Sequence, residues 1–345
     1  MGYWHILTLA HSHIPTFPHS HILTFPHSHI PTFSTFVAMS KGLVIKSTGS
    51  WYQVLDGNGV VHSCRVRGKV RTHGIRTTNP IAVGDQVSIE SDSTGEMVIT
   101  DIDDRKNYVI RKSVNLSKEA QIVAANIDIA LLVVTLKQPD TSTGFIDRFI
   151  ATAEAYHIET ILVLHKCDIY SDEEMETVDE LIDLYESIGY RTVKVSSVTG
   201  QGLDELRELI KGKVSMLGGH SGTGKSTLIN KLVPGMELRT GEISSYHQKG
   251  MHTTTFAEMF RLPEGGFIID TPGIKGFGLV DIPKEEVHHH FVEFFRLLPD
   301  CKFHNCLHIN EPGCAVIRGL EEGTVAPSRY RSYLSICEDD GGIYR

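Results

Sequence analysis

A glycine-rich loop in the second half of the chain constrains the fold more than any other feature. The run GHSGTGKS, at 219–226, fits the pattern G-x-x-x-x-G-K-[ST]. An apolar, strand-like stretch precedes it (214–217), and an apolar stretch that opens a helix follows it (228–232). In such a unit the loop amides and the positive end of the helix face one anionic group. A glycine-rich turn without a ligand is the alternative, but the strand, the Lys-Ser pair and the helix together predict an α/β domain that binds a polyphosphate.

The loop pattern assigns separate roles to its residues. Lys225 would reach the β- and γ-phosphates of a nucleotide and act in catalysis, and the Ser226 hydroxyl would hold Mg²⁺. The residues expected to bind the nucleotide here are Gly219, His220, Ser221, Gly222, Thr223, Gly224, Lys225, Ser226 and Thr227.

A second motif, DTPG, follows the apolar stretch 266–269 and therefore begins at a strand end. Asp270 would hold Mg²⁺ through water, and the amide of Gly273 would contact the γ-phosphate. D-x-x-G alone is a common turn, so its weight comes from its position after a phosphate loop. Between the two motifs lies HTTT, with His252 followed by threonines. Thr254 and Thr255 are expected to act in catalysis by offering a hydroxyl to Mg²⁺, although a plain β-rich threonine segment is the alternative.

A third motif, HKCD at 165–168, follows the apolar stretch 160–164. The Asp168 carboxylate would accept hydrogen bonds from both N1–H and the exocyclic amine of guanine, which adenine does not offer. The usual form is N-K-x-D; here His165 replaces the asparagine that ties the base to the phosphate loop, and an imidazole has a different reach. The run SSVTG, at 196–200, follows another short strand and would offer backbone N–H to the guanine carbonyl. The residues expected to bind the base are His165, Lys166, Cys167, Asp168, Ser196 and Ser197.

The order of these motifs is itself informative. Most GTPases carry the phosphate loop first and the guanine-reading motif last, whereas here HKCD precedes the phosphate loop and DTPG follows it. The chain runs through the fold from a different starting point, which indicates a circularly permuted P-loop GTPase.

Length and composition indicate a multidomain protein. A chain of 345 residues is long enough for two or three domains, each with its own core. No apolar run reaches the roughly eighteen residues that a membrane span needs. The net charge of −9 argues against wholesale binding of nucleic acid, but residues 41–118 carry twelve Lys and Arg against eight Asp and Glu. The N-terminal part is therefore basic on an acidic protein.

The pattern of the basic N-terminal part predicts a small β-barrel. Five or so short β-rich runs alternate with turn signals between residues 42 and 110, which makes the oligonucleotide-binding barrel a natural candidate. Basic residues gather on one strand and its following loop, and alternate positions share one strand face. That face would contact an RNA backbone or be merely solvated; the barrel context favours RNA. These residues are Arg65, Arg67, Lys69, Arg71 and Arg76.

The first 38 residues differ from the rest. They contain the repeats HSHIPTFP, HSHILTFP and HSHIPTFS, which start at His11, His19 and His27. A His-rich tract can bind metal, but we favour a translated upstream repeat with the biological start at Met39, because the tract is interrupted by proline and lacks the pattern of a transit peptide. We expect this leader to be disordered.

Near the C-terminus, cysteine and histidine have the spacing C-x₄-C-x-H-x₅-C. Three thiolates and one imidazole form a closed tetrahedral zinc set, which is structural because no ligand position is left for water. Disulfides are not expected in a protein with a nucleotide switch and no secretory signal. His304 is a possible substitute ligand, and His288 to His290, on a helix-like stretch over 285–298, are expected at the surface or in helix packing. The expected ligands are Cys301, Cys306, His308 and Cys314.

Together these features resemble one family. The basic barrel, the permuted motif order, HTTT, DTPG and the cysteine–histidine knuckle, with the TGFIDR segment at 143–148, are similar to the ribosome small subunit-dependent GTPase A (RsgA) family over about residues 41–340. The resemblance implies an OB-like barrel, a permuted GTPase domain and a helical zinc-binding domain. We expect the leader at 1–38, the barrel at 39–112, the GTPase domain at 113–280 and the zinc-binding domain at 281–345.

The resemblance also implies an activity. It implies a cytoplasmic GTPase that uses GTP and GDP with Mg²⁺, holds one structural Zn²⁺, docks on the small ribosomal subunit and its rRNA late in maturation, and hydrolyses GTP when that subunit stimulates it. We expect a monomer with no membrane association. The subunit would complete the catalytic machinery by ordering the switch segment, so turnover without it should be slow.

The residue that orients the attacking water is a separate question. Ile274 stands where many small GTPases have a water-orienting glutamine, and its side chain cannot orient water. We hypothesise that His252 does so, because a neutral imidazole accepts a hydrogen bond near pH 7. Two other classes of function compete with the GTPase: an ATP-using kinase on the same loop, which Asp168 disfavours, and an RNA-binding adaptor with a structural nucleotide, which stimulated hydrolysis would exclude.

Overall fold

The computed structural model describes residues 39–67, 80–112, 120–236, 238, 257–270 and 283–338. Several expectations concern residues outside these ranges. They are those for the leader at 1–38, for Lys69, Arg71 and Arg76, for His252 and the threonines 253–255, and for Gly273.

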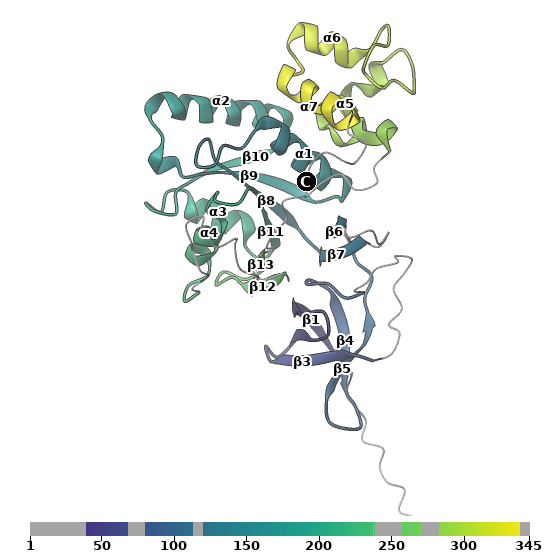
Figure 1. Ribbon diagram of the computed structural model, residues 1–345, viewed down its shortest axis with the longest axis vertical. Coiled ribbons are helices and arrows are strands. Elements are labelled where there is room, and N and C mark those ends of the chain that lie inside the picture. Colours follow the sequence, from purple (N-terminus) through teal and green to yellow (C-terminus); the bar gives the residue numbers. More distant parts are fainter. Residues whose placement is uncertain are drawn as a thin grey trace, which may run out of the picture. The chain divides into compact units, whose positions relative to one another are not determined.

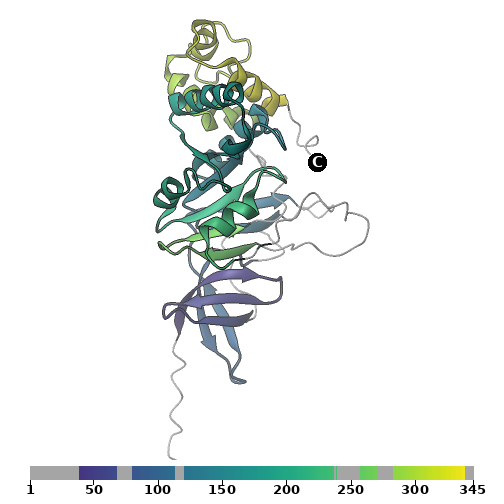
Figure 2. The ribbon, with the colours of Figure 1, turned by 90° about the vertical axis from the view of Figure 1, so that its left-hand side faces the viewer.

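The N-terminal strands form a closed barrel, drawn in purple and blue in Figures 1 and 2. The strands are β1 (Ser40–Ser47), β2 (Tyr52–Asp56), β3 (Val61–Val66), β4 (Gln86–Ser91) and β5 (Met97–Ile102). Their pairing order is β1–β2–β3–β5–β4, and β4 pairs with β1 to close the ring. Alternation along each strand supplies the core: Tyr52 and Val54 are buried, whereas Gln53 between them is exposed. The predicted barrel is confirmed.

A two-stranded antiparallel sheet follows the barrel. It pairs β6 (Tyr108–Lys112) with β7 (Ala120–Ala125). Val83, in the loop before β4, bridges to Ala124 of β7. The domain boundary expected between residues 112 and 113 therefore falls between two paired strands.

The central sheet is parallel and carries helices on both faces (Figure 1). Its pairing order is β10–β9–β8–β11–β13–β12, and the short strand β12 is antiparallel to β13. The strands are β8 (Ile129–Val134), β9 (Glu159–His165), β10 (Arg191–Val195), β11 (Val214–Gly218), β12 (Glu258–Arg261) and β13 (Phe267–Asp270). The helices are α1 (Thr143–Ala155), α2 (Asp172–Ile188), α3 (Leu203–Ile210) and α4 (Lys225–Leu232), with a 3₁₀ turn η1 at Cys167–Ile169.

Strand β8 shows why this sheet is covered on both sides. All of its residues are buried, which is typical of a central parallel strand. Leu131 and Val133 belong to the core under α3 and α4, while Leu132 and Val134 belong to the core under α1 and α2. Strand β12 also pairs with β1 of the barrel, where Lys46 lies opposite Glu258.

The C-terminal region is helical, as predicted. Its elements are η2 (Lys284–His290), α5 (Val292–Leu297), η3 (Leu298–Asp300), α6 (Ala315–Glu322) and α7 (Pro327–Glu338). The single helix expected over 285–298 is instead broken at Phe291, which has extended backbone angles. Phe291 is fully buried, and its ring packs against the rings of Phe294 and Tyr333. Packing in this core, and not the helical spacing of apolar residues, therefore determines the backbone at Phe291. Among the described residues, none of the helices combines the length and apolarity needed to cross a membrane.

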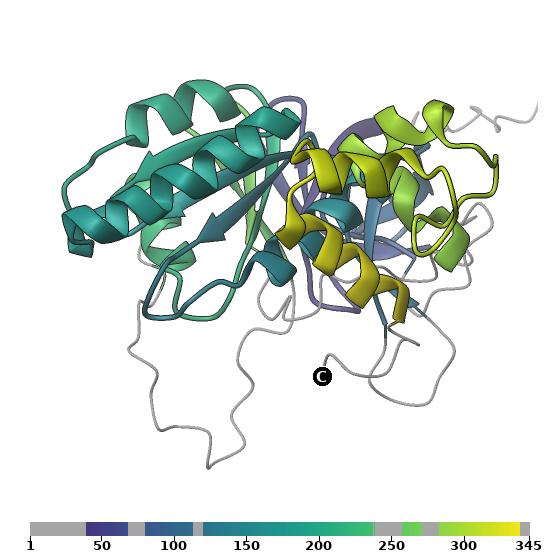
Figure 3. The same ribbon diagram turned by 90° about the horizontal axis from the view of Figure 1, so that it is seen from above.

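Arg329 is fully buried and joins α7 to α1, which lie side by side in Figure 3. It donates to both oxygens of Glu293 at 2.7 and 3.0 Å, and to Asp147 Oδ1 at 2.8 Å. The Tyr185 hydroxyl donates to the same Asp147 oxygen at 2.7 Å. Burial alone would lower the pKa of Arg329, but Asp147 and Glu293 outweigh it and the pKa is raised.

This network predicts a large cost for losing the arginine. Replacing Arg329 with methionine keeps an apolar stem but leaves the Asp147 and Glu293 carboxylates buried without a cation, so we expect a loss of roughly 3 kcal/mol in the free energy of unfolding. Denaturant unfolding measures it. Arg331→Met, on the exposed side of the same helix, is the matched control and should change stability by less than about 0.5 kcal/mol. Equal effects of the two substitutions would contradict the prediction.

Candidate nucleotide site and metal centre

The predicted nucleotide motifs meet at one edge of the central sheet. HKCD begins at the last residue of β9, SSVTG follows β10, the phosphate loop follows β11, and Asp270 ends β13. Because these strands are parallel, their carboxyl ends lie at the same edge, where open α/β sheets bind ligands. Segments that are far apart in the sequence are thereby brought to one place.

The phosphate loop is tightly folded around its glycines. Gly219 and Gly224 have positive φ angles of 131° and 95°. A Cβ on Gly219 would lie 2.5 Å from the carbonyl oxygen of Val133, so no larger residue fits without movement. Helix α4 begins directly afterwards at Lys225, so its first free amides face the loop. The loop therefore has the backbone form that a polyphosphate requires.

The side chain of Lys225 reaches back into this loop. Its Nζ donates to the carbonyl oxygens of Gly219 at 2.8 Å and His220 at 2.6 Å. Burial lowers the pKa of Lys225 to about 8, against the opposing effect of Asp270. Burial likewise raises the pKa of Asp270, although Lys225 favours its charged form. Phosphate oxygens in the loop would stabilise the ammonium form of Lys225.

The two proposed magnesium ligands lie on neighbouring elements of the central domain. Ser226 lies in the first turn of α4, next to Lys225, and Asp270 lies at the end of the adjacent strand β13. A hydroxyl and a carboxylate beside a polyphosphate are the hard oxygen donors that Mg²⁺ takes in such sites. The donor set therefore fits the ion.

The loop at 165–168, called the base-reading loop for its expected role, is held by a chain of hydrogen bonds. The Ser196 hydroxyl donates to Asp168 Oδ1 at 2.5 Å and accepts from the amides of Val198 and Thr199 at 3.2 and 3.1 Å. Ser196 thus fixes the direction of the Asp168 carboxylate. The side chain of Cys167, by contrast, packs in the apolar core, and its thiol donates to the Leu164 carbonyl. Cys167 therefore belongs to the core and not to the base site proposed for Asp168.

Two residues connect the base-reading loop to the phosphate loop. Lys166 Nζ donates to the Gly222 carbonyl at 2.8 Å and also to the Gln138 carbonyl. His165 is buried, with Nδ1 2.7 Å from the Thr223 carbonyl oxygen and Nε2 2.8 Å from Ser197 Oγ. The histidine that replaces asparagine therefore still links these loops.

One contact was missed by sequence reasoning. Phe145 of α1 stacks on His220 of the phosphate loop, with ring centroids 3.9 Å apart. Four residues later on the same helix, the ring of Phe149 occupies the space where a Cβ on Gly218 would lie. The TGFIDR segment was the available signal, but its pattern carries no information about which loop it contacts.

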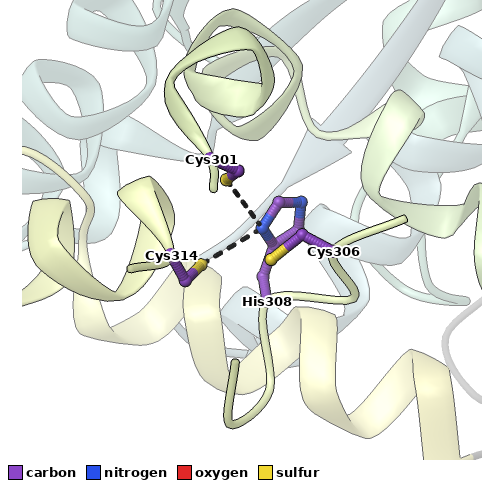
Figure 4. A group of neighbouring side chains, drawn as sticks. All are labelled: Cys301, Cys306, His308 and Cys314. Atoms are coloured by element: carbon purple, nitrogen blue, oxygen red, sulfur yellow. Dashed lines mark hydrogen bonds between the residues drawn. The ribbon is translucent and has the colours of Figure 1, made fainter. Parts of the chain in front are cut away.

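The four predicted zinc ligands form one cluster, shown in Figure 4. Their ligand atoms all lie within 4.8 Å of one another. His308 Nδ1 lies 3.7 Å from Cys301 Sγ and 3.3 Å from Cys314 Sγ, and a tetrahedral zinc site has sulfur–nitrogen edges of about 3.5 Å. Cys306 completes the set, whereas His304 is exposed and is not part of it. The cluster is compatible with a structural zinc ion.

Comparison with known proteins agrees with this geometry. The family model of the RsgA GTPase matches residues 102–280, and that of the RsgA N-terminal domain matches residues 41–99. A protein of Bacteroides fragilis named small ribosomal subunit biogenesis GTPase RsgA is 55% identical over 306 residues, which cover 88% of this chain and 99% of the relative. The protein of the same name from Christiangramia forsetii is 53% identical over 310 residues, with 88% and 98% covered.

The chain belongs to the RsgA family of GTPases.

Solved structures extend the likeness to the fold. The crystal structure of YjeQ from Thermotoga maritima superposes with a TM-score of 0.72 at 36% identity and covers 88% of this chain and 98% of that one. YloQ, described as a circularly permuted GTPase, superposes with a TM-score of 0.67 at 28% identity and covers 91% and 97%. The predicted family, the permuted GTPase fold and the GTP hydrolase class are confirmed.

Proposed function

We propose that this RsgA protein binds the small ribosomal subunit, assists its late maturation, and hydrolyses GTP to GDP and phosphate when the subunit stimulates it. The observation that carries the proposal is the direct link of the base-reading loop to the phosphate loop through His165 and Lys166. The name of the Bacteroides fragilis relative supplies the partner. We propose the cytoplasm as the location and a monomer as the active form.

Within the nucleotide site, roles follow from chemistry. Asp168 accepts hydrogen bonds from the guanine N1–H and exocyclic amine. The Ser196 hydroxyl, 2.5 Å from Asp168 Oδ1, orients the carboxylate for this role. Lys225 neutralises the β- and γ-phosphates, and Ser226 and Asp270 hold Mg²⁺, which supplies charge stabilisation when bound. The proposals for water positioning by His252 and for Mg²⁺ contacts by Thr254 and Thr255 remain predictions.

For the barrel, we propose contact with rRNA. Trp51 is 40% exposed, and the Arg65 guanidinium lies 4.2 Å from the centroid of its ring, which makes a surface on which an unpaired base can stack. Arg65 lies 3.7 Å from Glu96 and is half-exposed. An exposed pair of this kind is worth at most about 1 kcal/mol, so a phosphate can displace the carboxylate.

The test is nucleotide hydrolysis by the purified protein, with GTP or ATP and with or without isolated small ribosomal subunits. We expect GTP turnover that rises strongly with subunits, and no ATP turnover. Asp168→Asn should reduce GTP affinity by about 10- to 100-fold, because it removes a charged acceptor and presents an amide donor to the donors of guanine. Asp172→Asn, an exposed acid at the start of α2, is the matched control and should leave affinity unchanged.

Other outcomes separate the competing functions. Equal turnover of ATP and GTP would favour an ATP-using enzyme on the same phosphate loop. Binding of GTP without hydrolysis in either subunit condition would favour an adaptor that uses the nucleotide structurally.

A further inference from the structure

His165 is enclosed by the loops that make the nucleotide site. His165 is only 3% exposed. Each ring nitrogen has one partner: the Thr223 carbonyl for Nδ1 and the Ser197 hydroxyl for Nε2. These partners come from the phosphate loop and from the loop after β10. One side chain therefore holds three separate loops together.

The two contacts determine the protonation of the ring. A carbonyl oxygen only accepts, so the proton must sit on Nδ1, which donates to Thr223. In a neutral imidazole the other nitrogen is then an acceptor, so Nε2 accepts from the Ser197 hydroxyl. Protonation would convert Nε2 into a donor, so the Ser197 hydroxyl would have to turn and accept, and it would place a positive charge in a buried position.

The phosphate loop is shaped to admit this ring. A Cβ on Gly224 would lie 2.5 Å from His165 Cε1 and 2.7 Å from its Nδ1. Gly224, the residue directly before α4, therefore also makes room for the imidazole.

We propose that His165, as the neutral Nδ1–H tautomer, is a positioning residue that holds the base-reading loop, the phosphate loop and the loop after β10 in the arrangement that binds guanine nucleotides, and that protonation of His165 releases this arrangement. The inference rests on the proposed function, because it takes GDP and GTP as the ligands. With His165, nucleotide affinity falls at acidic pH, whereas an asparagine at this position does not titrate and gives no such fall.

The surrounding charges determine the pH range. Burial lowers the pKa of His165 below its usual 6.5, and Lys166 lowers it further, while the hydrogen bond to Thr223 and the Asp168 carboxylate raise it. The phosphate loop presents the Thr223 carbonyl, the loop after β10 presents the Ser197 hydroxyl, and the Tyr170 hydroxyl donates to the His165 carbonyl. His165 is therefore neutral at pH 7, and affinity should fall as the pH drops below its lowered pKa.

The experiment is GDP binding by calorimetry between pH 5 and pH 8 for the full chain and for His165→Asn, His165→Ala and Ser197→Ala. At pH 7.5 we expect His165→Ala to weaken GDP binding by about tenfold, with His165→Asn and Ser197→Ala between it and the wild type. Below the pKa of His165, the affinity of the wild type relative to His165→Asn should fall by up to about tenfold per pH unit. The Asn variant is the matched control because it differs from the wild type only at position 165 and shares the other residues of the site.

Measurements of GTP hydrolysis distinguish a positioning role of His165 from a catalytic role. In subunit-stimulated turnover, we expect His165→Ala to raise KM while kcat stays near the wild-type value, because the residue acts on nucleotide binding through the loops. An affinity ratio between wild type and His165→Asn that is constant with pH would overturn the proposal, as would wild-type affinity in His165→Ala. Failure of the wild type to bind GDP at any pH would refute the proposed function itself.

Discussion

Replacing Lys225 with methionine is expected to lower kcat/KM for GTP by about 10³-fold. The methionine fills a similar volume, but it cannot donate to phosphate oxygens or neutralise the charge that develops during phosphoryl transfer, and removing one such donor costs about 10²- to 10³-fold in rate before any loss of binding. Subunit-stimulated hydrolysis at low GTP measures the effect. Lys231→Met, an exposed lysine in the last turn of the same helix, is the matched control.

The same lysine predicts a pH dependence on the alkaline side. Burial lowers the pKa of Lys225 to about 8 in the protein without nucleotide, and phosphates favour its charged form. Binding therefore takes up a proton when the pH is above about 8, so GTP affinity should fall there in the wild type and not in Lys225→Met. Activity of Lys225→Met within tenfold of the wild type would show that this loop does not hold the reacting phosphates.

Removing a zinc ligand is expected to have the largest effect on stability. Cys306→Ser replaces a buried thiolate in the cluster of Cys301, His308 and Cys314, and structural zinc contributes about 10–16 kcal/mol of apparent binding free energy in zinc-finger peptides. We expect the variant to lose its bound zinc and residues 283–338 to become sensitive to proteolysis. Metal analysis and limited proteolysis measure the two effects.

A second buried cysteine provides the control for zinc binding. Cys337 lies in the same apolar core on α7 but outside the ligand set, so Cys337→Ser should retain zinc. Zinc content that is equal in the Cys306 and Cys337 variants would contradict a metal role for the cluster. A chelator should destabilise the wild type and leave Cys306→Ser unchanged.

The barrel and the central sheet were predictable because their signals are local. The five or so short strands expected between residues 42 and 110 are found as β1 to β5, and alternating apolar residues such as Tyr52 and Val54 indicate which side is buried. The stretch over 285–298 shows the limit of such signals. Its apolar spacing is helical, but Phe291 packs against Phe294 and Tyr333 in a core that the local pattern does not contain, and the helix breaks there.

The basic strand shows a similar limit. The alternation of Arg65 and Arg67 was evident from the sequence, but their partners were not. In the barrel, Arg65 lies near Glu96 and Arg67 pairs with Glu90, because β3 lies beside β5 and β5 lies beside β4. Two of the five predicted basic residues are therefore paired with carboxylates across the sheet, and the other three lie outside the described residues.

By itself, the sequence determined the strand–loop–helix of the phosphate loop, the permuted motif order and the zinc quartet, because each depends on residue types at short spacing. Only the tertiary structure decided which groups these motifs meet. Thr223 is 58 residues from His165, and Asp147 is 182 residues from Arg329. Such pairs form because the order of parallel strands and the packing of helices bring distant segments together, and buried polar groups must find partners among whatever the fold places beside them.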